Sequence, residues 1–405
     1  TSTAANLLRR KEAAHVGRFI ETHLIPRNNA IRAATHPGPA RPGAVRRPQL
    51  GGALLSVVVL VLMATCPFLC FVWHAAGTLA RFFPKINITT IRRKIYTYFM
   101  RLAIFFFVRA PGLKVHLYGD AKEVFQRDES VLYMSNHQSS VDWLVACILA
   151  MKAKCLDRIK FIMKQELHWV PIVGYYISVI GHIYVRRRGF RPDRLIESVN
   201  CYTKAQTPIW VGIFPEGTRF NPEDRKAITY SEEMAKSSKL PPLKHQLTPR
   251  PKGSWLLLDN MRSHLSAVYS VTLVYEQAEP RGQRARPPSA ADVIRGQCSN
   301  VHVHVKRIPI EDVPKEEAQF LPWLHNESLE RDKRMSEYYS TRSFASWGPA
   351  LEDDEDSTAH IPDLSWVVLM GLGLLLAPLV RKMYILTALA STLCGYVSLE
   401  MQPPF

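Results

Sequence analysis

The stretch VLYMSNHQSSVDW, residues 131–143, joins two apolar runs through a short polar segment. Residues 131–134 have the composition of a short buried strand, and residues 141–149 that of the start of an apolar helix. The segment between them therefore predicts a strand-to-helix turn that carries His137. A histidine on such a turn is a candidate for proton transfer.

His137 is followed five positions later by Asp142. On one continuous helix these two side chains would lie about 140° apart, so a turn has to intervene if they are to meet. Ser139 or Ser140 is a natural N-cap, which predicts Asp142 in the first helical turn with its carboxylate free to reach the imidazole ring. The pattern Ser139-x-x-Asp142 also fits an acidic capping box, in which Asp142 serves only the helix and His137 is a loop histidine.

From about residue 112 to residue 313, short β-rich runs alternate with helical patterns. The predicted strands are residues 113–118, 131–134, 159–163, 182–185, 209–214, 267–275 and 301–305. The predicted helices include residues 141–153, 194–204 and 231–237, and a charged helical segment follows at 315–343. This order predicts an α/β domain at residues 111–345, with a mixed, largely buried sheet flanked by helices. In open sheets of this kind, sites form at strand ends.

Two basic residues follow predicted strands. Lys164 comes directly after the third strand, and Arg187 lies in a run of three arginines after the fourth. A lysine offers a point charge to an anion, and an arginine offers a planar fork of donors that suits phosphate. Both are candidates for holding an anionic substrate; the alternative is an ordinary solvated or lipid-facing basic edge.

The segment FPEGTR, residues 214–219, lies at the end of the most apolar predicted strand. Gly217 permits a tight turn, which would let Arg219 swing back over the strand end. Glu216 and Arg219 could instead form an internal salt bridge of a loop. A weaker basic stretch, LKHQLTPR at residues 243–250, adds positive charge.

Apolar segments near both ends of the chain predict membrane insertion. Residues 53–73 are uncharged and long enough to cross a bilayer, which predicts a transmembrane helix within residues 51–80. The C-terminal hydrophobic segment at residues 363–400 is interrupted by Arg381 and Lys382. Each half is near the short limit for a span, so a hairpin, a re-entrant pair and one tilted helix all remain open.

Three further segments complete the predicted organisation. Residues 1–50 form a basic, proline-rich leader to which no fold is assigned; its composition is typical of a transit peptide, and an artefactual or processed extension is the alternative. Residues 85–110 predict an interfacial amphipathic helix with basic anchors, or else a buried helix of the domain. Residues 346–362 form an acidic linker.

The net charge of +17 and the pI of about 9.6 favour either nucleic acid or an anionic membrane surface as partner. The apolar segments favour the membrane, and the sequence has no zinc spacing or aromatic motif typical of nucleic-acid binding. The seven cysteines are odd in number and scattered, so they indicate neither a disulfide framework nor a metal site. They are typical of a domain in a reducing compartment.

Three blocks together resemble a known family. NHQSSVD at residues 136–142, the block from Lys164 to Arg187 and FPEGTR at residues 214–219 have the order and spacing of the blocks of the 1-acyl-sn-glycerol-3-phosphate acyltransferases. The sequence segments around these blocks, such as GHIYVRR and LKHQLTPR, are most similar to those of the epsilon type. The resemblance covers about residues 52–345 and implies a glycerolipid-acyltransferase-like domain.

This resemblance implies a membrane-bound enzyme that moves a fatty acyl group from acyl-CoA to the sn-2 hydroxyl of lysophosphatidic acid and forms phosphatidic acid. His137 would be the general base, and Asp142 would hold its tautomer. The implied acceptor residues are Lys164, Arg187 and Arg219 for the phosphate, and Glu216, Gly217 and Thr218 in the acceptor-site loop. Glu216 would orient Arg219 rather than act as an acid.

The resemblance also implies that no cofactor or metal is needed, because acyl-CoA is a co-substrate. It implies the endoplasmic reticulum membrane with the catalytic domain facing the cytosol, and a mitochondrial membrane is the alternative. Glycerol-3-phosphate or another lysophospholipid is an alternative acceptor. A serine hydrolase, which would need a G-x-S-x-G elbow that the chain lacks, and a non-enzymatic membrane scaffold are the remaining alternatives.

Overall fold

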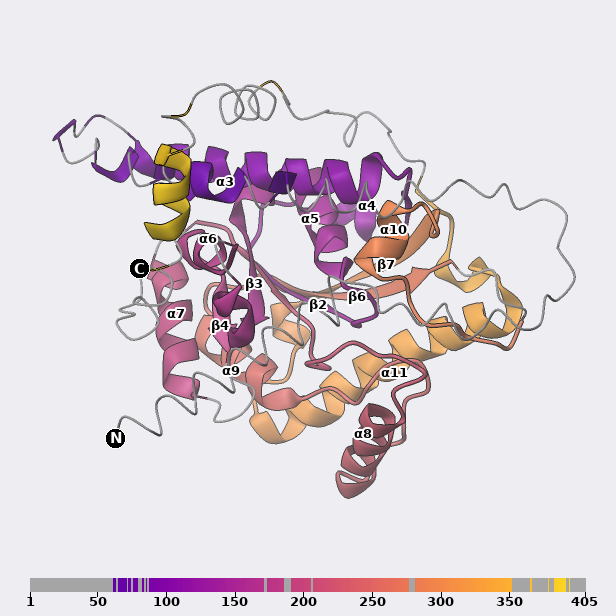
Figure 1. Cartoon of the computed structure of the whole chain (residues 1–405). Coiled ribbons are helices and arrows are strands. Elements are labelled where there is room, and N and C mark those ends of the chain that lie inside the picture. Colours follow the sequence, from indigo (N-terminus) through magenta and orange to yellow (C-terminus); the bar gives the residue numbers. More distant parts are fainter. Residues whose placement is uncertain are drawn as a thin grey trace, which may run out of the picture.

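The computed structural model describes residues 87–170, 173–185, 191–204, 207–276 and 281–351, together with parts of 61–85 and of 365–393 (Figure 1). In this part of the chain one seven-stranded sheet lies between two layers of helices. Helices α3 (Ile88–Ile104) and α5 (Asp142–Lys152) cover one face, and α9 (Pro251–Met261) and α11 (Glu317–Thr341) cover the other. The predicted α/β class with a mixed sheet flanked by helices is confirmed.

The sheet contains all seven predicted strands: β1 (Lys114–Gly119), β2 (Val131–Ser135), β3 (Ile159–Lys164), β4 (Ile183–Val185), β5 (Trp210–Ile213), β6 (Ala267–Tyr275) and β7 (Asn300–Pro309). Their order is β1-β7-β6-β2-β5-β3-β4. The strands from β6 to β4 run parallel, β7 pairs antiparallel with β6, and β1 pairs parallel with β7. Strand β7 runs past its predicted end because its last residues pair with the first residues of β6. Every residue of β2, β5 and β6 is buried, as apolar runs in a covered sheet require.

Local sequence signals set several helix ends. Asn87 and Asp224 cap α3 and α8 (Arg225–Ser237), because each side-chain oxygen accepts a backbone N–H of the first turn. The cap explains why α8 begins before the predicted residue 231.

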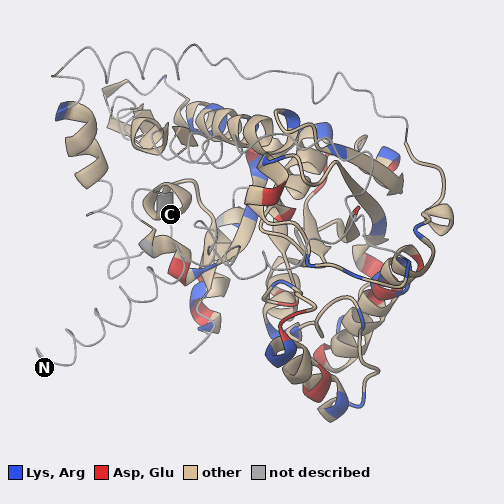
Figure 2. Cartoon of the chain, turned by 45° about the vertical axis from the view of Figure 1, so that its right-hand side comes forward, with Lys and Arg blue, Asp and Glu red and all other residues tan. Residues whose placement is uncertain are grey.

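Acidic and basic side chains are interspersed on α8 and α11 (Figure 2). The other helices are α4 (Ala121–Val124), α6 (Val173–Val179), α7 (Pro192–Lys204) and α10 (Ala290–Ile294); a π-helical turn covers Phe105–Arg109, and 3-10 turns cover Leu156–Arg158, Gln165–Trp169, Ile310–Asp312 and Ala345–Trp347.

Helix α3 falls within the predicted interfacial segment at residues 85–110. One of its faces packs into the core, where Tyr96 donates a hydrogen bond from its hydroxyl to the carbonyl of Ile159 at 2.7 Å. Arg101, one turn further along, is exposed. The helix is therefore part of the domain core on one side, and contact of its other side with a membrane surface stays a prediction.

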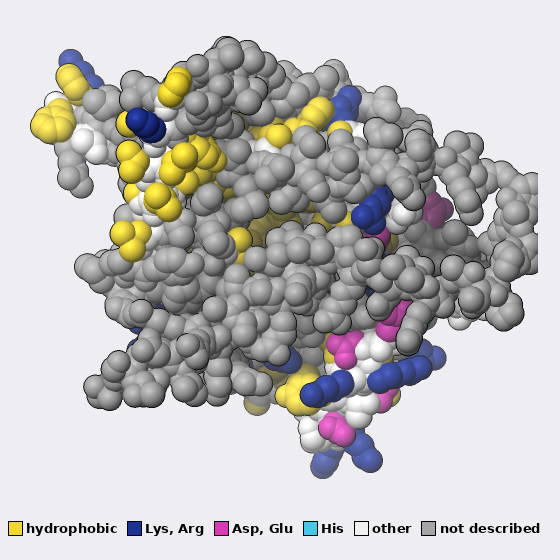
Figure 3. Space-filling view, in the orientation of Figure 1, with side chains coloured by type: hydrophobic (Ala, Val, Ile, Leu, Met, Phe, Trp, Pro, Cys, Tyr) yellow, Lys and Arg dark blue, Asp and Glu magenta, His cyan; other side chains and the backbone are white. Residues whose placement is uncertain are grey.

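The apolar segments near the chain ends fall mostly outside the described residues. Among the residues that are described, no helix combines the length and hydropathy needed to cross a bilayer. The predicted leader at residues 1–50 and residues 352–362 of the predicted linker also lie outside the described part. The helix at residues 382–390 exposes apolar side chains, including Met383, Leu386 and Leu389, which gather at one end of the molecule (Figure 3).

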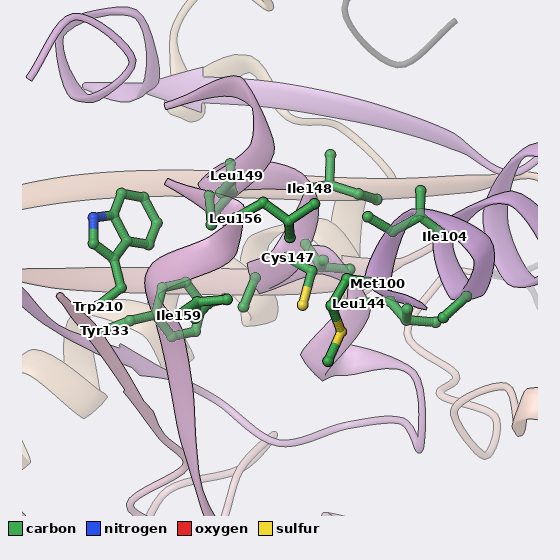
Figure 4. Close-up of a cluster of buried hydrophobic side chains, with 14 of the residues drawn as sticks. Met100, Ile104, Tyr133, Leu144, Cys147, Ile148, Leu149, Leu156, Ile159 and Trp210 are labelled. Atoms are coloured by element: carbon green, nitrogen blue, oxygen red, sulfur yellow. The ribbon is translucent and has the colours of Figure 1, made fainter. Parts of the chain in front are cut away.

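The two largest apolar clusters of the described residues lie on opposite faces of the sheet. Successive residues of β2 alternate between them: Tyr133 belongs to the cluster under α3 and α5, and Leu132 to the cluster over α9 and α11. In the first cluster Met100 of α3 packs beside Leu144 of α5 (Figure 4). Burial of each such side chain is worth about 1.5–3 kcal/mol. These clusters hold the carboxyl end of β2, and with it the start of α5, in a rigid frame.

Candidate active site

His137 and Asp142 meet in the turn between β2 and α5. The imidazole Nδ1 lies 2.8 Å from Oδ2 of Asp142, although the two residues are five apart in the chain. Asp142 is the first residue of α5 and is completely buried, whereas the His137 side chain is 21% exposed. Because Nδ1 is engaged by the carboxylate, Nε2 is the ring nitrogen that is left to accept a proton.

Several donors hold the Asp142 carboxylate in place. Oδ2 also accepts the backbone N–H groups of Gln138 at 2.6 Å and Ser139 at 2.9 Å. Oδ1 accepts the hydroxyl of Tyr275, the last residue of β6, at 2.7 Å. These hydrogen bonds fix the carboxylate so that Oδ2 is directed at the histidine.

The predicted N-cap of α5 was wrong. Val141 occupies that position and makes no side-chain cap. The Ser139 hydroxyl instead donates to the carbonyl of Pro288 at 2.5 Å, and the Ser140 hydroxyl accepts the N–H of Ala290 at 2.9 Å. The serines therefore fasten the turn to the segment that connects β6 and β7, a contact that local sequence cannot reveal.

The environment of His137 favours the neutral ring. Burial lowers its pKa below the usual value for histidine, and the positive charges of Arg219 and Lys164 lower it further, against the opposing effect of Asp142. Phe214 stacks on the imidazole with ring centroids 4.3 Å apart. A neutral imidazole at physiological pH is what a general base requires.

The Phe214–Thr218 turn lies directly against His137. Gly217 has a φ of +69°, a left-handed conformation that L side chains rarely adopt, and its N–H closes the turn onto the carbonyl of Phe214 at 2.9 Å. The predicted tight turn is therefore present.

The prediction that Glu216 orients Arg219 was wrong. The carboxyl group of Glu216 is buried and accepts two backbone N–H groups, that of His137 at 2.6 Å and that of Leu247 at 2.8 Å. Within the described residues it makes no ion pair with Arg219. Burial raises the pKa of Glu216 to about 8, although the two N–H donors oppose this rise. Through these two hydrogen bonds Glu216 links the His137 turn to residues 244–247.

The structure brings two of the three predicted cations to the histidine. The charges of Lys164, at the end of β3, and of Arg219 both act on the His137 ring. Arg187 lies outside the described residues. Arg286, which the sequence analysis did not single out, lies close enough to lower the pKa of Arg219, although burial is the larger cause of that lowering.

Tyr275 and the arginines of one connection between strands were not identified from the sequence. Tyr275 has the sequence surroundings of an ordinary strand residue, and no neighbouring residue in the chain indicates a role in the site. Arg284 and Arg286 belong to the run RGQRAR at residues 281–286. Three arginines within six residues between two strands are a signal that could have drawn attention to this connection.

A cavity of about 270 Å³ opens beside the acceptor-site loop. Its wall includes Glu216, Thr218 and Arg250, and helix α8 closes the opposite side with Lys226 and Tyr230. Asp224 also lines it, and its lining does not include His137, Lys164 or Arg219. Within the described residues, no group of three or more histidine, cysteine or carboxylate side chains gathers to hold a metal ion.

Two family models match the chain, Acyltransferase at residues 115–260 and Acyltransferase C-terminus at residues 292–370. Over 342 residues the chain is 32% identical to the 1-acyl-sn-glycerol-3-phosphate acyltransferase epsilon of Mus musculus, which covers 83% of this chain and 93% of the relative. The chain belongs to the 1-acyl-sn-glycerol-3-phosphate acyltransferase family. The family resemblance predicted from the three sequence blocks is thereby confirmed.

Other members of the 1-acyl-sn-glycerol-3-phosphate acyltransferase family are also similar. The Arabidopsis thaliana acyltransferase 2 is 29% identical over 270 residues, which is 65% of each chain. The human delta acyltransferase is 30% identical over 218 residues, which is 53% of this chain and 55% of the relative. The crystal structure of the 1-acyl-sn-glycerophosphate (LPA) acyltransferase PlsC from Thermotoga maritima aligns with 69% of this chain and 97% of that chain, at 17% identity and a TM-score of 0.37.

Proposed function

We propose that this acyltransferase family member moves a fatty acyl group from acyl-CoA to the sn-2 hydroxyl of lysophosphatidic acid and releases phosphatidic acid and coenzyme A. The observation that carries the proposal is the His137–Asp142 contact of 2.8 Å, set beside the charges of Lys164 and Arg219. The names of the related acyltransferases support the same reaction class.

The chemistry needs one base, because a thioester is reactive and an alcohol is not. Nε2 of His137 takes the proton of the sn-2 hydroxyl as its oxygen attacks the thioester carbonyl carbon. The carbon–sulfur bond then breaks, and the departing thiolate recovers the proton from the imidazolium, which Asp142 stabilises meanwhile. General-base help of this kind is worth about 10² to 10⁴ in rate.

The acceptor is held by charge. Lys164 and Arg219 would grip the phosphate of lysophosphatidic acid, with Arg187 as the third predicted cation. Gly217 and Thr218 shape the acceptor-site loop beside the imidazole. No cofactor is invoked, since acyl-CoA is consumed as a co-substrate.

The enzyme is proposed to work at a bilayer. Residues 51–80 would form the transmembrane helix and residues 363–400 the C-terminal membrane segment, so that the membrane supplies the lysophospholipid. The proposed location is the endoplasmic reticulum membrane with the catalytic domain facing the cytosol, and a mitochondrial membrane is the alternative. The apolar side chains exposed on residues 382–390 support membrane contact.

The test offers radiolabelled acyl-CoA to membranes that contain the full chain, with lysophosphatidic acid, glycerol-3-phosphate and other lysophospholipids as parallel acceptors. Transfer to lysophosphatidic acid, lost in His137→Ala while membrane insertion is unchanged, is expected. His264→Ala, at a histidine just after α9, is the matched control and should stay active. Near-normal turnover by His137→Ala would overturn the mechanism. If the enzyme prefers another acceptor, that acceptor takes the place of lysophosphatidic acid as the proposed substrate. Labelling by a fluorophosphonate would indicate a serine hydrolase.

A further inference from the structure

We propose that Arg284, in the connection between β6 and β7, is a positioning residue that holds the His137 turn in its reactive geometry. The inference rests on the proposed function and deepens it. Arg284 lies 146 residues from Gln138 in the chain, yet its Nη2 donates a hydrogen bond to the side-chain oxygen of Gln138, the residue directly after His137.

The guanidinium of Arg284 closes a triangle of hydrogen bonds. Its Nη1 donates to the carbonyl of His245 at 2.7 Å. The side-chain amide of Gln138 donates to the same carbonyl at 3.1 Å. The turn after β2, the segment around His245 and the β6–β7 connection are therefore tied together by one side chain and one carbonyl.

Two aromatic rings fix the plane of the guanidinium. Its central carbon lies 4.1 Å from the ring centre of Phe220 and 4.7 Å from that of Tyr339 on α11. The backbone N–H of Phe220 donates to the carbonyl of His137 at 2.8 Å. Arg284 thus reaches the histidine by a second route, and only a planar cation with several donors can both stack and bridge in this way.

Two buried carboxyl groups lie near Arg284. Glu216 and Asp332 both lie within electrostatic reach of the guanidinium. Asp332 accepts the N–H groups of Lys244 at 3.0 Å and His245 at 2.7 Å, and Glu216 accepts those of His137 and Leu247. Residues 244–247, a stretch whose role the sequence left undefined, are held at both ends by these carboxyl groups, with Arg284 between them.

This arrangement separates Arg284 from the cations that would grip the phosphate. Its two terminal nitrogens are used within the protein, and aromatic rings lie within cation–π distance of its plane. Loss of Arg284 should therefore disturb the orientation of the His137 turn and leave phosphate binding intact. A misplacement of reacting groups by about 1 Å can cost about 10²-fold in rate.

The experiment measures kcat and KM of the full-length membrane enzyme with lysophosphatidic acid. Arg284→Met, which keeps an unbranched apolar stem, should lower kcat by about 10²-fold and leave KM within about twofold. Arg284→Lys keeps the charge without the planar fork of donors, so its kcat should be about tenfold lower than that of the wild type. Arg281→Met, at an exposed arginine of the same connection, is the matched control and should behave as the wild type.

A double-mutant cycle with Gln138→Met separates positioning from general loss of structure. If Arg284 acts through Gln138, the double variant should be no slower than the slower single variant. Multiplying losses, an unchanged kcat in Arg284→Met, or a rise in KM alone would each overturn the inference. If Arg284→Met fails to fold, as judged by its melting temperature, Gln138→Met must still show the loss in kcat, and full activity there overturns the inference. If the wild-type enzyme transfers no acyl group, the proposed function itself is overturned. If the wild type is active and the variants are unaffected, only the inference about Arg284 is overturned.

Discussion

The Asp142 carboxylate both contacts the His137 ring and is itself held in place by other hydrogen bonds. It accepts hydrogen bonds from the His137 ring, from the Tyr275 hydroxyl and from two backbone N–H groups of its own turn. The first bond sets the tautomer of the histidine, and the others fix the carboxylate so that it cannot rotate away. The proposed catalytic unit is thus a rigid pair, and both members should be needed.

Asp142→Asn should lower kcat by about 10² to 10⁴, because the imidazolium loses its anionic partner. The Asp142 charge raises the pKa of His137, so its removal should lower that pKa further. Since the neutral ring is the active form, the acidic limb of the profile of kcat/KM against pH should move to lower pH. Asp259→Asn, at an exposed position of α9, is the control. An unmoved acidic limb would contradict the electrostatic role of Asp142.

Arg219→Ala should move the acidic limb of the profile of kcat/KM against pH in the opposite direction. The positive charge of Arg219 lowers the pKa of His137, so its loss should raise that pKa and move the acidic limb to higher pH. The KM for lysophosphatidic acid should rise about tenfold or more, because a charge-assisted hydrogen bond is worth about 1.5–3 kcal/mol. Arg225→Ala, at the exposed start of α8, serves as the control. An unchanged KM would argue against a phosphate contact.

The close approach of β3 and β5 positions the acceptor-site loop. Gly212 of β5 faces Phe161 of β3, and a Cβ atom at residue 212 would lie 2.6 Å from the Phe161 ring. Strand β5 leads directly into Phe214, so its placement decides where the turn meets His137. A glycine in a strand of this kind marks a place where a neighbour comes close.

Gly212→Ala should therefore destabilise the domain by about 1–3 kcal/mol, the usual cost of overpacking a core. Gly253→Ala in α9 is a sharp control, because a Cβ there would meet the nearest atom, in Ile213, at an ordinary 4.0 Å. It should leave the domain equally stable or about 0.4–1 kcal/mol more stable. Urea unfolding measures both; a Gly212→Ala protein as stable as Gly253→Ala would refute the packing argument.

The molecule as a whole combines a covered α/β domain with an apolar segment near each end of the chain and a net charge of +17. Its described surface carries charges of both signs on α8 and α11, whereas the helix at residues 382–390 exposes apolar side chains. These exposed apolar groups support the proposal that the enzyme takes its acceptor from a bilayer.

We expect the full chain to stay with membranes during alkaline carbonate extraction, because residues 51–80 would anchor it. A chain without residues 363–400 should still sediment with the membranes, whereas removal of both segments should release it into the supernatant. Release of the full chain by carbonate would contradict the predicted transmembrane helix.

Much of the fold could be predicted from the sequence, because its signals are local. The inner strands are short apolar runs, and β1 and β7 alternate polar with apolar residues, so all seven were found. The contact of His137 with Asp142 was one of two possibilities that the spacing left open, because both residues belong to one short segment at residues 137–142. Strand order and the reversed direction of β7 could not be predicted, since they depend on contacts between distant segments.

From the sequence alone follow the family, the strands, and the pair made of the proposed base His137 and its partner Asp142, because each is encoded in short blocks of neighbouring residues. Only the tertiary structure decided how that block is held. Glu216 binds a backbone N–H that lies 79 residues away, and Arg284 reaches a side chain 146 residues away. Such partners are set by how the sheet and α11 pack, so no local pattern distinguishes a buried support from a residue that faces the substrate.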